Sequence, residues 1–424
     1  MDYIISGAEL FRNDRFISSD LFVSDGKIAD IAPNISLSGV SVFNFNNAVV
    51  LPGLSDVHVH LREPGFLYKE TIRTGTEAAA AGGYTSICAM PNLLPVPDCA
   101  ENLAPELEAI ERDALIHVYP YGAITVGQKS EKLADMDSMA DSVIAFSDDG
   151  KGVKTADMMR RAMRKAQSLA KMIVAHCEDE SLIRGGCVHD GEYAAEHGLA
   201  GNPSESEWTQ VRRDIDLVRE TDCRYHVCHV STKESVALIR AAKAEGLSIT
   251  CETAPHYLVL CDRDLCDDGR FKMNPPIRSA DDRDALIDGI KDGTIDMIAT
   301  DHAPHSAEEK SGGLKGCLNG IVGLETAFPI LYTELVKKGV ISLEKLVDLM
   351  HGAPQRIFGI GSDINVGESA DFAVFDLNTE YTIDPESFRS MGRATPFAGR
   401  KVFGRCLACF CGGRLVYDLQ KGGR

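Results

Sequence analysis

Short apolar segments with strand character alternate with helix-like segments through the middle of this chain, and this order limits the possible folds more than any other feature. Strands that alternate with helices favour a parallel sheet, and eight such strands favour a closed (β/α)8 TIM barrel. The site of a barrel of this kind forms from the loops that follow its strands. The predicted strands are residues 54–59, 84–89, 116–121, 143–147, 172–176, 225–230, 248–252 and 296–300, and helix-like segments include 71–81, 154–170, 232–245 and 280–291.

The two ends of the chain have a different pattern. Residues 1–50 contain short strand-like runs broken by turns, one of them at Asp25-Gly26. After a helix-like stretch near 343–357, strand-like runs return at 370–376, 401–403 and 414–417. We therefore expect 52–359 to form the barrel, and 1–51 together with 360–424 to form one small β unit beside it.

Histidine and aspartate residues stand at the ends of several predicted strands. His58 and His60 are two positions apart on one strand, so their side chains point to the same face and can bind one ion together. His176, His229 and Asp301 each follow a separate apolar run, and we expect them to meet at the mouth of the barrel. The runs lie too far apart in the sequence for a local zinc motif, so the fold must assemble this metal site.

Each of these residues also has an ordinary structural explanation. A single histidine such as His176 is more often a packed or surface residue, and Asp301 could cap a helix. Asp148 and Asp149 follow the fourth predicted strand in an Asp-Gly turn, and spacing alone leaves open which of them faces the site. If Asp301 lies beside a metal ion, its carboxylate can both ligate the ion and accept a proton from water.

Two histidines compete for the site on the predicted strand 225–230. Alternation places His229 on one face with Tyr225 and Val227, and His226 on the other face. His229 is nearer the end of the strand and is the better candidate. We expect His226 to pack under a helix.

The loops after the strands carry candidate substrate-binding residues. Arg62 lies two residues beyond His60, where a guanidinium group suits a substrate carboxylate, although a surface arginine is the ordinary explanation. Asn92 and Asn274 lie in proline-containing loops that hold an amide rigidly, or they are turn asparagines.

Composition limits the partners and the compartment. The formal net charge of −19 excludes nucleic acid and anionic membrane as partners, because these need clustered Lys and Arg, and it leaves a small-molecule substrate. No apolar run approaches the roughly 20 residues of a membrane helix. The 13 cysteines and the absence of a basic and apolar leader indicate a reducing cytoplasm. Cys406, Cys409 and Cys411 lack the second pair of a zinc ribbon and are expected to be free thiols.

A set of motifs spans nearly the whole chain. They are Pro52-Gly53-Leu54, His58-Val59-His60-Leu61-Arg62-Glu63-Pro64-Gly65, Ala89-Met90-Pro91-Asn92, Ser147-Asp148-Asp149-Gly150, Ala175-His176-Cys177-Glu178-Asp179, Cys228-His229-Val230-Ser231-Thr232-Lys233, Lys272-Met273-Asn274-Pro275-Pro276 and Ala299-Thr300-Asp301-His302-Ala303-Pro304-His305. With these motifs the sequence closely resembles the bacterial type I dihydroorotases of the amidohydrolase superfamily.

The resemblance implies a metal-dependent (β/α)8 barrel with a composite β-sandwich made from both termini, and two zinc ions per chain. It implies Asp149, rather than Asp148, as the residue that bridges the two ions. In related hydantoinases a carboxylated lysine takes this place, and Asp149 makes such a modification of Lys151 or Lys154 unnecessary. The implied metal ligands are His58, His60 and Asp301 for one zinc, His176 and His229 for the other, and Asp149 for both.

The implied reaction is the reversible closure of N-carbamoyl-L-aspartate to L-dihydroorotate in pyrimidine synthesis, with Asp301 as the catalytic proton carrier. The implied substrate contacts are His60, Arg62, Asn92 and His305 near the substrate carboxylate, Asn274 on the ring side, and backbone atoms of Asn319 and Gly320.

One loop departs from the family pattern. The family usually has Pro-Phe-Gly before Ile-Val-Gly, whereas this chain has Leu318-Asn319-Gly320 there. Backbone contacts from this loop tolerate a changed side chain better than side-chain contacts would. Residues 306–316, which are rich in Gly, Lys and Glu, look like a mobile lid.

Two other functions remain open at this point. An allantoinase or dihydropyrimidinase would share the barrel and the paired histidines, but its substrate would leave Arg62 without a carboxylate partner. A non-catalytic subunit that only supports aspartate transcarbamoylase would have no need for a metal site. We expect a homodimer, and an aspartate transcarbamoylase complex stays open.

Overall fold

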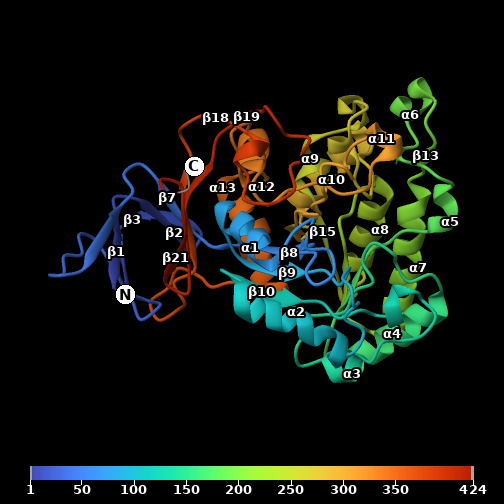
Figure 1. The fold of residues 1–424 in the computed structure, drawn as a ribbon, viewed down its shortest axis with the longest axis horizontal. Coiled ribbons are helices and arrows are strands. Elements are labelled where there is room, and N and C mark those ends of the chain that lie inside the picture. Colours follow the sequence, from blue (N-terminus) through green and yellow to red (C-terminus); the bar gives the residue numbers. More distant parts are fainter. Residues whose placement is uncertain (1, 422–424) are drawn as a thin grey trace.

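The computed structural model describes residues 2–421, which form a mixed arrangement of helices and strands (Figure 1). The strands are β1 (Tyr3–Ser6), β2 (Glu9–Arg12), β3 (Arg15–Ser18), β4 (Asp20–Ser24), β5 (Lys27–Ala32), β6 (Ser41–Asn44), β7 (Val49–Pro52), β8 (Leu54–Val59), β9 (Tyr84–Ala89), β10 (His117–Pro120), β11 (Ile173–Ala175), β12 (Val188–His189), β13 (Gly201–Asn202), β14 (Tyr225–Val227), β15 (Ile249–Thr253), β16 (Met297–Ile298), β17 (Phe372–Asp376), β18 (Tyr381–Thr382), β19 (Lys401–Val402), β20 (Arg405–Cys411) and β21 (Arg414–Asp418).

The helices vary from single turns to the long α7. They are α1 (Ile72–Ala81), α2 (Ala100–Asp113), α3 (Met136–Met139), α4 (Ala156–Ser168), α5 (Glu180–Ile183), α6 (Glu192–His197), α7 (Glu205–Thr221), α8 (Lys233–Ala244), α9 (Pro255–Val259), α10 (Ala280–Asp292), α11 (Gly313–Gly316), α12 (Ala327–Leu331), α13 (Leu343–Val347) and α14 (Ala353–Phe358), with 3₁₀ turns η1 (Val126–Gln128), η2 (Asp262–Asp264), η3 (Gly269–Phe271) and η6 (Pro385–Ser387) and π-helical turns η4 (Tyr332–Val336) and η5 (Asp348–Gly352).

Strands from the two ends of the chain share one sheet. The order of this six-stranded sheet is β21-β20-β17-β7-β2-β3, and a second sheet has the order β5-β4-β1-β6. The blue and red strands therefore lie together on the left of Figure 1. Tyr3 stacks on Phe410 with ring centroids 5.2 Å apart, and Phe372 stacks on Phe410 with ring centroids 4.7 Å apart. Aromatic side chains from both ends thus fill one core.

One predicted C-terminal run pairs elsewhere. The run predicted at 401–403 forms β19, which pairs only with β18 in a separate two-stranded ladder and not with the strands from the N-terminal end. The prediction missed β20, the strand that carries the three C-terminal cysteines and pairs with both β17 and β21.

The middle of the chain holds two larger sheets of parallel strands, with the orders β10-β9-β8 and β11-β14-β15-β16, and a short parallel pair, β12-β13. The prediction of a full strand at 143–147 was wrong. The segment forms only isolated bridges at Phe146, opposite Gly122 and Ile173, and a few further backbone hydrogen bonds to Pro120 and Gly122. The extended segment ends after Ser147 because the chain turns at Asp148–Gly152, where Lys151 N donates to Asp148 O. In the three-stranded sheet, the edge strand β8 also pairs at Val59 with His302.

The boundaries of the predicted helices lie within two residues of the observed ones, because a capping residue precedes each helix in the sequence. Thr71, Thr155, Thr232 and Ser279 each accept a hydrogen bond from a backbone N–H of the first helical turn. The stretch predicted near 343–357 is helical but changes from α13 to the π-helical η5 and then to α14.

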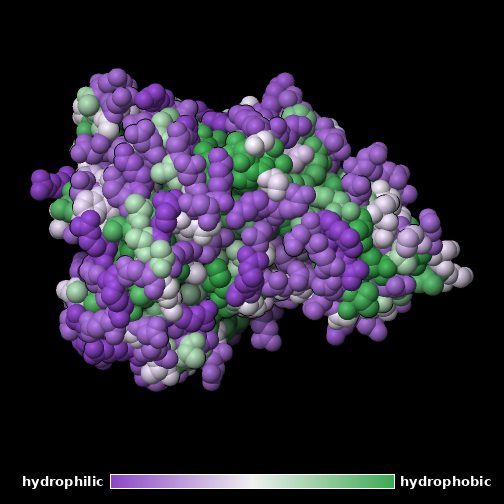
Figure 2. Space-filling view, turned by 180° about the vertical axis from the view of Figure 1, so that it is seen from behind, coloured by the Kyte–Doolittle hydropathy of each residue, from purple (hydrophilic) through white to green (hydrophobic). Residues whose placement is uncertain are grey.

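Among the described residues, no helix has both the length and the apolar character needed to cross a bilayer. Hydrophilic side chains cover much of the face in Figure 2, and hydrophobic residues show between them near the middle of the molecule.

Candidate metal centre and active site

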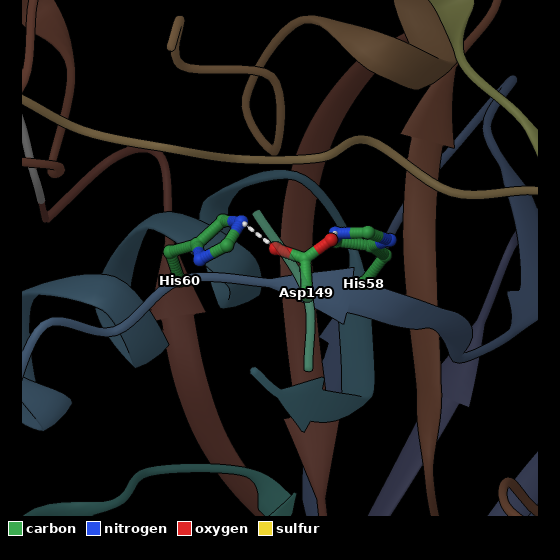
Figure 3. Close-up of side chains that lie close together, drawn as sticks. All are labelled: His58, His60 and Asp149. Carbon is green, nitrogen blue, oxygen red and sulfur yellow. Dashed lines mark ion pairs between the residues drawn. The ribbon is translucent and has the colours of Figure 1, made fainter. Parts of the chain in front are cut away.

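Asp149 lies at the centre of the predicted histidines. Its Oδ1 is 3.4 Å from His58 Nε2, 3.6 Å from His176 Nδ1 and 3.5 Å from His229 Nε2. Its Oδ2 is 3.5 Å from His60 Nε2. Figure 3 shows the carboxylate between the rings of His58 and His60. Two potential metal groups, His58/His60/Asp149 and Asp149/His176/His229, therefore share one carboxylate.

These atoms fit a metal site better than a hydrogen-bond network. Separations of 3.4–3.6 Å are long for hydrogen bonds, but ligands of a tetrahedral zinc ion lie about 3.3 Å apart. Among the described residues, His58 Nε2 and Asp149 Oδ1 are buried and have no hydrogen-bond partner. Buried polar atoms in native proteins are normally satisfied, so these two indicate a missing partner such as a cation.

The charges of the cluster favour a cation. Burial alone would raise the pKa of Asp149, yet the imidazoles of His58, His176 and His229 hold it well below its usual range. Burial alone would lower the pKa of His176, yet the carboxylates of Asp149 and Glu178 raise it to about 10. The centre thus stabilises positive charge next to Asp149.

Asp301 belongs to the same cluster. Its Oδ1 lies 3.1 Å from His60 Nε2 and 3.5 Å from His58 Nε2. Burial would raise the pKa of this carboxyl group, but the contact with His60 lowers it on balance. Asp301 is therefore a carboxylate at neutral pH, placed where it can accept a proton.

Three residues of the site have strained backbone. The φ angles of Arg62, His229 and Asp301 are 63°, 35° and 49°, in the left-handed region that side chains other than glycine rarely adopt. Such strain persists where the surrounding structure holds it in place, and it gathers at functional sites.

The backbone at His229 also corrects the argument from strand alternation. β14 ends at Val227, so alternation no longer applies at His229, and the turn at this residue brings its ring to Asp149. His226 lies against Phe358 of α14, a helix contact as expected, with ring centroids 5.1 Å apart. Its Nε2 is also 2.9 Å from Glu252, a contact that alternation did not predict.

The two adjacent aspartates have different surroundings. Asp148 Oδ1 accepts hydrogen bonds from the backbone N–H groups of Ile124 and Thr125, so this side chain anchors the loop. Asp149 instead faces the histidines. Lys154 is exposed and pairs with Glu180 at 3.4 Å, and Lys151 is exposed as well, so neither lysine takes the central position.

Sequence reasoning missed two glutamates that hold the histidines. Glu252, at the end of the seventh predicted strand, lies 2.7 Å from His58 Nδ1 and also contacts His226. Glu178 lies 3.3 Å from His176 Nε2. The position of Glu252 at a strand end was a usable signal, since the same signal pointed to His58, His60, His176, His229 and Asp301.

A cavity of about 210 Å³ opens above the centre. Five of its lining residues belong to the cluster, namely His60, Asp149, His176, His229 and Asp301, and the rest come from the loops. Fully buried His58 lies beneath the cavity wall and does not line it. The cavity is lined by His60, Arg62, Asn92, Asp149, Gly150, His176, His229, Asn274, Asp301, Ala303, His305, Asn319 and Gly320.

The predicted substrate-binding residues differ in how they are held. Arg62 Nε donates to Pro304 O at 3.2 Å, and burial lowers the pKa of its guanidinium group. His305 Nε2 donates to Asn319 O at 2.8 Å. Asn92 Nδ2 donates to the backbone oxygen of Asp149 at 2.6 Å.

Asn274 and the predicted lid, residues 306–316, both form hydrogen bonds to neighbouring residues. Asn274 Nδ2 donates to Glu178 Oε2 at 2.7 Å. Within 306–316, Lys310 Nζ donates to Lys272 O and Leu318 O, and Glu309 pairs with Lys69 at 2.9 Å. Glu309 Oε2 also lies 3.1 Å from Nδ1 of His305, which lines the cavity, so this segment lies against the cavity wall.

Comparison with known proteins decides the family. The dihydroorotase of Bacillus cereus (strain B4264) is 50% identical over 421 residues, which cover 97% of this chain and 98% of that protein. The chain belongs to the dihydroorotase family. A dihydroorotase of Bacillus anthracis has the same identity and coverage, and the family model described as "Dihydro-orotase-like" matches residues 47–235. Part of the site, from His58 to His229, lies within the matched segment.

Similar solved structures come from neighbouring enzymes of the amidohydrolase superfamily. The L-hydantoinase (dihydropyrimidinase) from Arthrobacter aurescens has a TM-score of 0.88 and 27% identity, and the match covers 98% of this chain and 96% of that chain. The dihydropyrimidinase from Brevibacillus agri NCHU1002 has a TM-score of 0.87 at 24% identity, covering 99% and 95%, which shows a common fold. This dihydroorotase-family chain therefore shares a mixed α/β fold with them over nearly its whole length.

Proposed function

We propose that this protein is a dihydroorotase, which reversibly closes N-carbamoyl-L-aspartate to L-dihydroorotate in pyrimidine synthesis. As a member of the family it is a hydrolase of cyclic amides. The observation that carries the specific proposal is one cavity in which a buried His and Asp cluster lies next to Arg62.

We propose a closed (β/α)8 barrel over 52–359 and a composite β-sandwich from 1–51 and 360–424. Support for the barrel comes from the two parallel sheets, from the pairing of Phe146 with residues on both sides and from the pairing of Val59 with His302. Support for the sandwich comes from the shared core around Phe372 and Phe410.

We propose that the cluster binds two zinc ions, with His58, His60 and Asp301 around one, His176 and His229 around the other, and Asp149 between them. When bound, zinc would supply Lewis acidity and lower the pKa of a coordinated water. The sharing of Asp149 between two ligand groups supports this count.

Asp301 carries the proton in the proposed reaction. As a carboxylate it accepts a proton from the attacking water during hydrolysis and passes it to the leaving ring nitrogen. In the direction of ring closure it accepts the proton from the attacking nitrogen and passes it to the departing hydroxide, which leaves as water. The buried contact with His60 keeps its carboxyl group ionised before the reaction begins.

The loops select the substrate. Arg62, Asn92 and His305 are proposed to bind the substrate carboxylate beside His60, and Asn274 to lie on the ring side. Backbone atoms of Asn319 and Gly320 line the same cavity. A guanidinium and a carboxylate form paired charge-assisted hydrogen bonds, whereas a neutral ring would leave Arg62 without a charge partner.

A substrate panel tests the assignment against the hydantoinase and dihydropyrimidinase activities named for the structural neighbours. The purified zinc-loaded protein is assayed with L-dihydroorotate, N-carbamoyl-L-aspartate, dihydrouracil, hydantoin and allantoin at matched concentrations. We expect turnover of the first two and almost none of the others. Comparable turnover of dihydrouracil or allantoin would exclude the proposed function.

A further inference from the structure

Of the four potential metal groups among the described residues, one lies outside the active site. His117 begins β10, Asp371 directly precedes β17, and Cys411 ends β20. The ligand atoms of these three residues all lie within 4.8 Å of one another, and His117 Nε2 is 3.1 Å from Asp371 Oδ2. The group therefore joins the parallel sheet of the middle of the chain to the sheet built from both ends.

The donor atoms are those of a transition-metal site. One nitrogen, one oxygen and one sulfur suit zinc and similar divalent ions. Asp371 and Cys411 are each only 2% exposed, whereas the His117 side chain is 44% exposed. An ion at this position would thus have fixed ligands on the inner side and access to solvent on the other, where a water could complete its coordination.

The surroundings of the three residues support this assignment. Asp371 Oδ1 accepts from Gly412 N at 2.5 Å, which fixes the carboxylate and leaves Oδ2 facing His117. The contact with Asp371, followed by that with Cys411, raises the pKa of His117 to about 10. The position therefore favours positive charge.

Cys409 on the same strand provides the contrast. Its thiol is equally buried and faces the backbone oxygen of Tyr84, just as the Cys411 thiol faces that of Thr85, but Cys409 belongs to none of the potential metal groups among the described residues. A buried cysteine in β20 therefore does not by itself form a potential metal group. Cys411 differs from Cys409 because it lies beside Asp371 and His117.

We propose that His117, Asp371 and Cys411 bind one divalent transition-metal ion of the zinc class. Binding releases the thiol proton of Cys411 and the proton shared by His117 and Asp371, so that nitrogen, carboxylate and thiolate all face the ion. The ion would link β10 to the start of β17 and the end of β20. This site is separate from the proposed catalytic centre.

Cobalt(II) is the probe, because a cobalt–thiolate bond gives a charge-transfer absorption band that histidine and carboxylate ligands do not give. The full-length protein is loaded with cobalt, and its spectrum and metal content are measured. We expect the band in the wild type and in Cys409→Ser. We expect its loss, together with one bound ion per chain, in Cys411→Ser.

His117→Gln provides a second variant, because the side chain is half exposed and its replacement should not prevent folding. We expect this variant to lose the same ion while it keeps dihydroorotate turnover, which distinguishes this site from the catalytic one. A wild type without the band, or a band that survives in Cys411→Ser, would overturn the proposal. Equal metal content in wild type and His117→Gln would show that His117 and Asp371 form only an ion pair, and this result would also overturn the proposal.

Discussion

The Nδ1 atom of His58 lies 2.7 Å from Oε1 of the buried Glu252. A carboxylate at this distance accepts a hydrogen bond from Nδ1–H and leaves the lone pair of Nε2 free for the proposed metal. The other carboxylate oxygen of Glu252 contacts His226, so the acceptor itself is held in place.

Glu252→Gln is expected to lower zinc affinity by about 10–100-fold, as is typical when the partner of a ligand histidine is lost. An amide can donate to His58 Nδ1 and so reverse the tautomer that the metal needs. Affinity is measured by competition with a chelator. Glu106→Gln is the control, since Glu106 is also buried but makes no side-chain hydrogen bond among the described residues. Equal affinity in both variants would rule out the positioning role.

Asp149→Ala is expected to reduce bound zinc below two ions per chain, because this carboxylate lies between both histidine groups. Metal content after dialysis is the measurement. Lys154→Arg and Lys151→Arg serve as controls and should keep both ions, since neither lysine occupies the centre. Full activity with one ion, or a carboxylated lysine at the site, would contradict the bridging role.

Asp301→Asn is expected to lower the rate in both directions by about 10²–10⁴-fold, the usual contribution of a general acid or base. The amide is similar in shape but cannot accept the proton. Most of the zinc should remain, and its content is measured alongside the rates. A rate within about tenfold of the wild type would show that another group transfers the proton.

Arg62→Met is expected to lower kcat/KM for dihydroorotate by about 10²-fold or more, because two charge-assisted hydrogen bonds each contribute about 1.5–3 kcal/mol. Zinc content should not change, since Arg62 is not a proposed ligand. Arg73→Met is the matched control, because Arg73 is exposed on α1 and pairs only with Glu77 among the described residues. An unimpaired Arg62 variant would remove this residue from substrate binding.

The ion pair between His117 and Asp371 predicts a pH-dependent stability in the chelator-treated protein. Because folding raises the pKa of His117 to about 10, its contribution is fully present below the unfolded pKa of about 6.5 and is lost as pH rises through 10. The Tm of the wild type should therefore fall toward that of His117→Gln over this range. A difference in Tm that does not vary with pH would contradict the pair.

Several features followed from local sequence. The helix starts at Thr71, Thr155, Thr232 and Ser279 were predictable because a capping side chain bonds to backbone only three positions away. His58 and His60 both reach Asp149, as their two-residue spacing predicted, although β8 already ends at Val59. The choice of Asp149 over Asp148 did not follow from spacing and came only from the resemblance.

Other features depended on the tertiary structure, because they join residues far apart in the chain or lie where regular structure ends. Local alternation could not place His229, which turns toward Asp149 only after β14 has ended. Cys411 is a free cysteine, as expected, but only the order of the sheets brings it close to His117 and Asp371. Local sequence indicated most of the helices and strands and the side chains at their ends, although β20 was missed and the strand predicted at 143–147 does not form. Which ends meet depended on long-range strand order and backbone turns, and no local pattern encodes these.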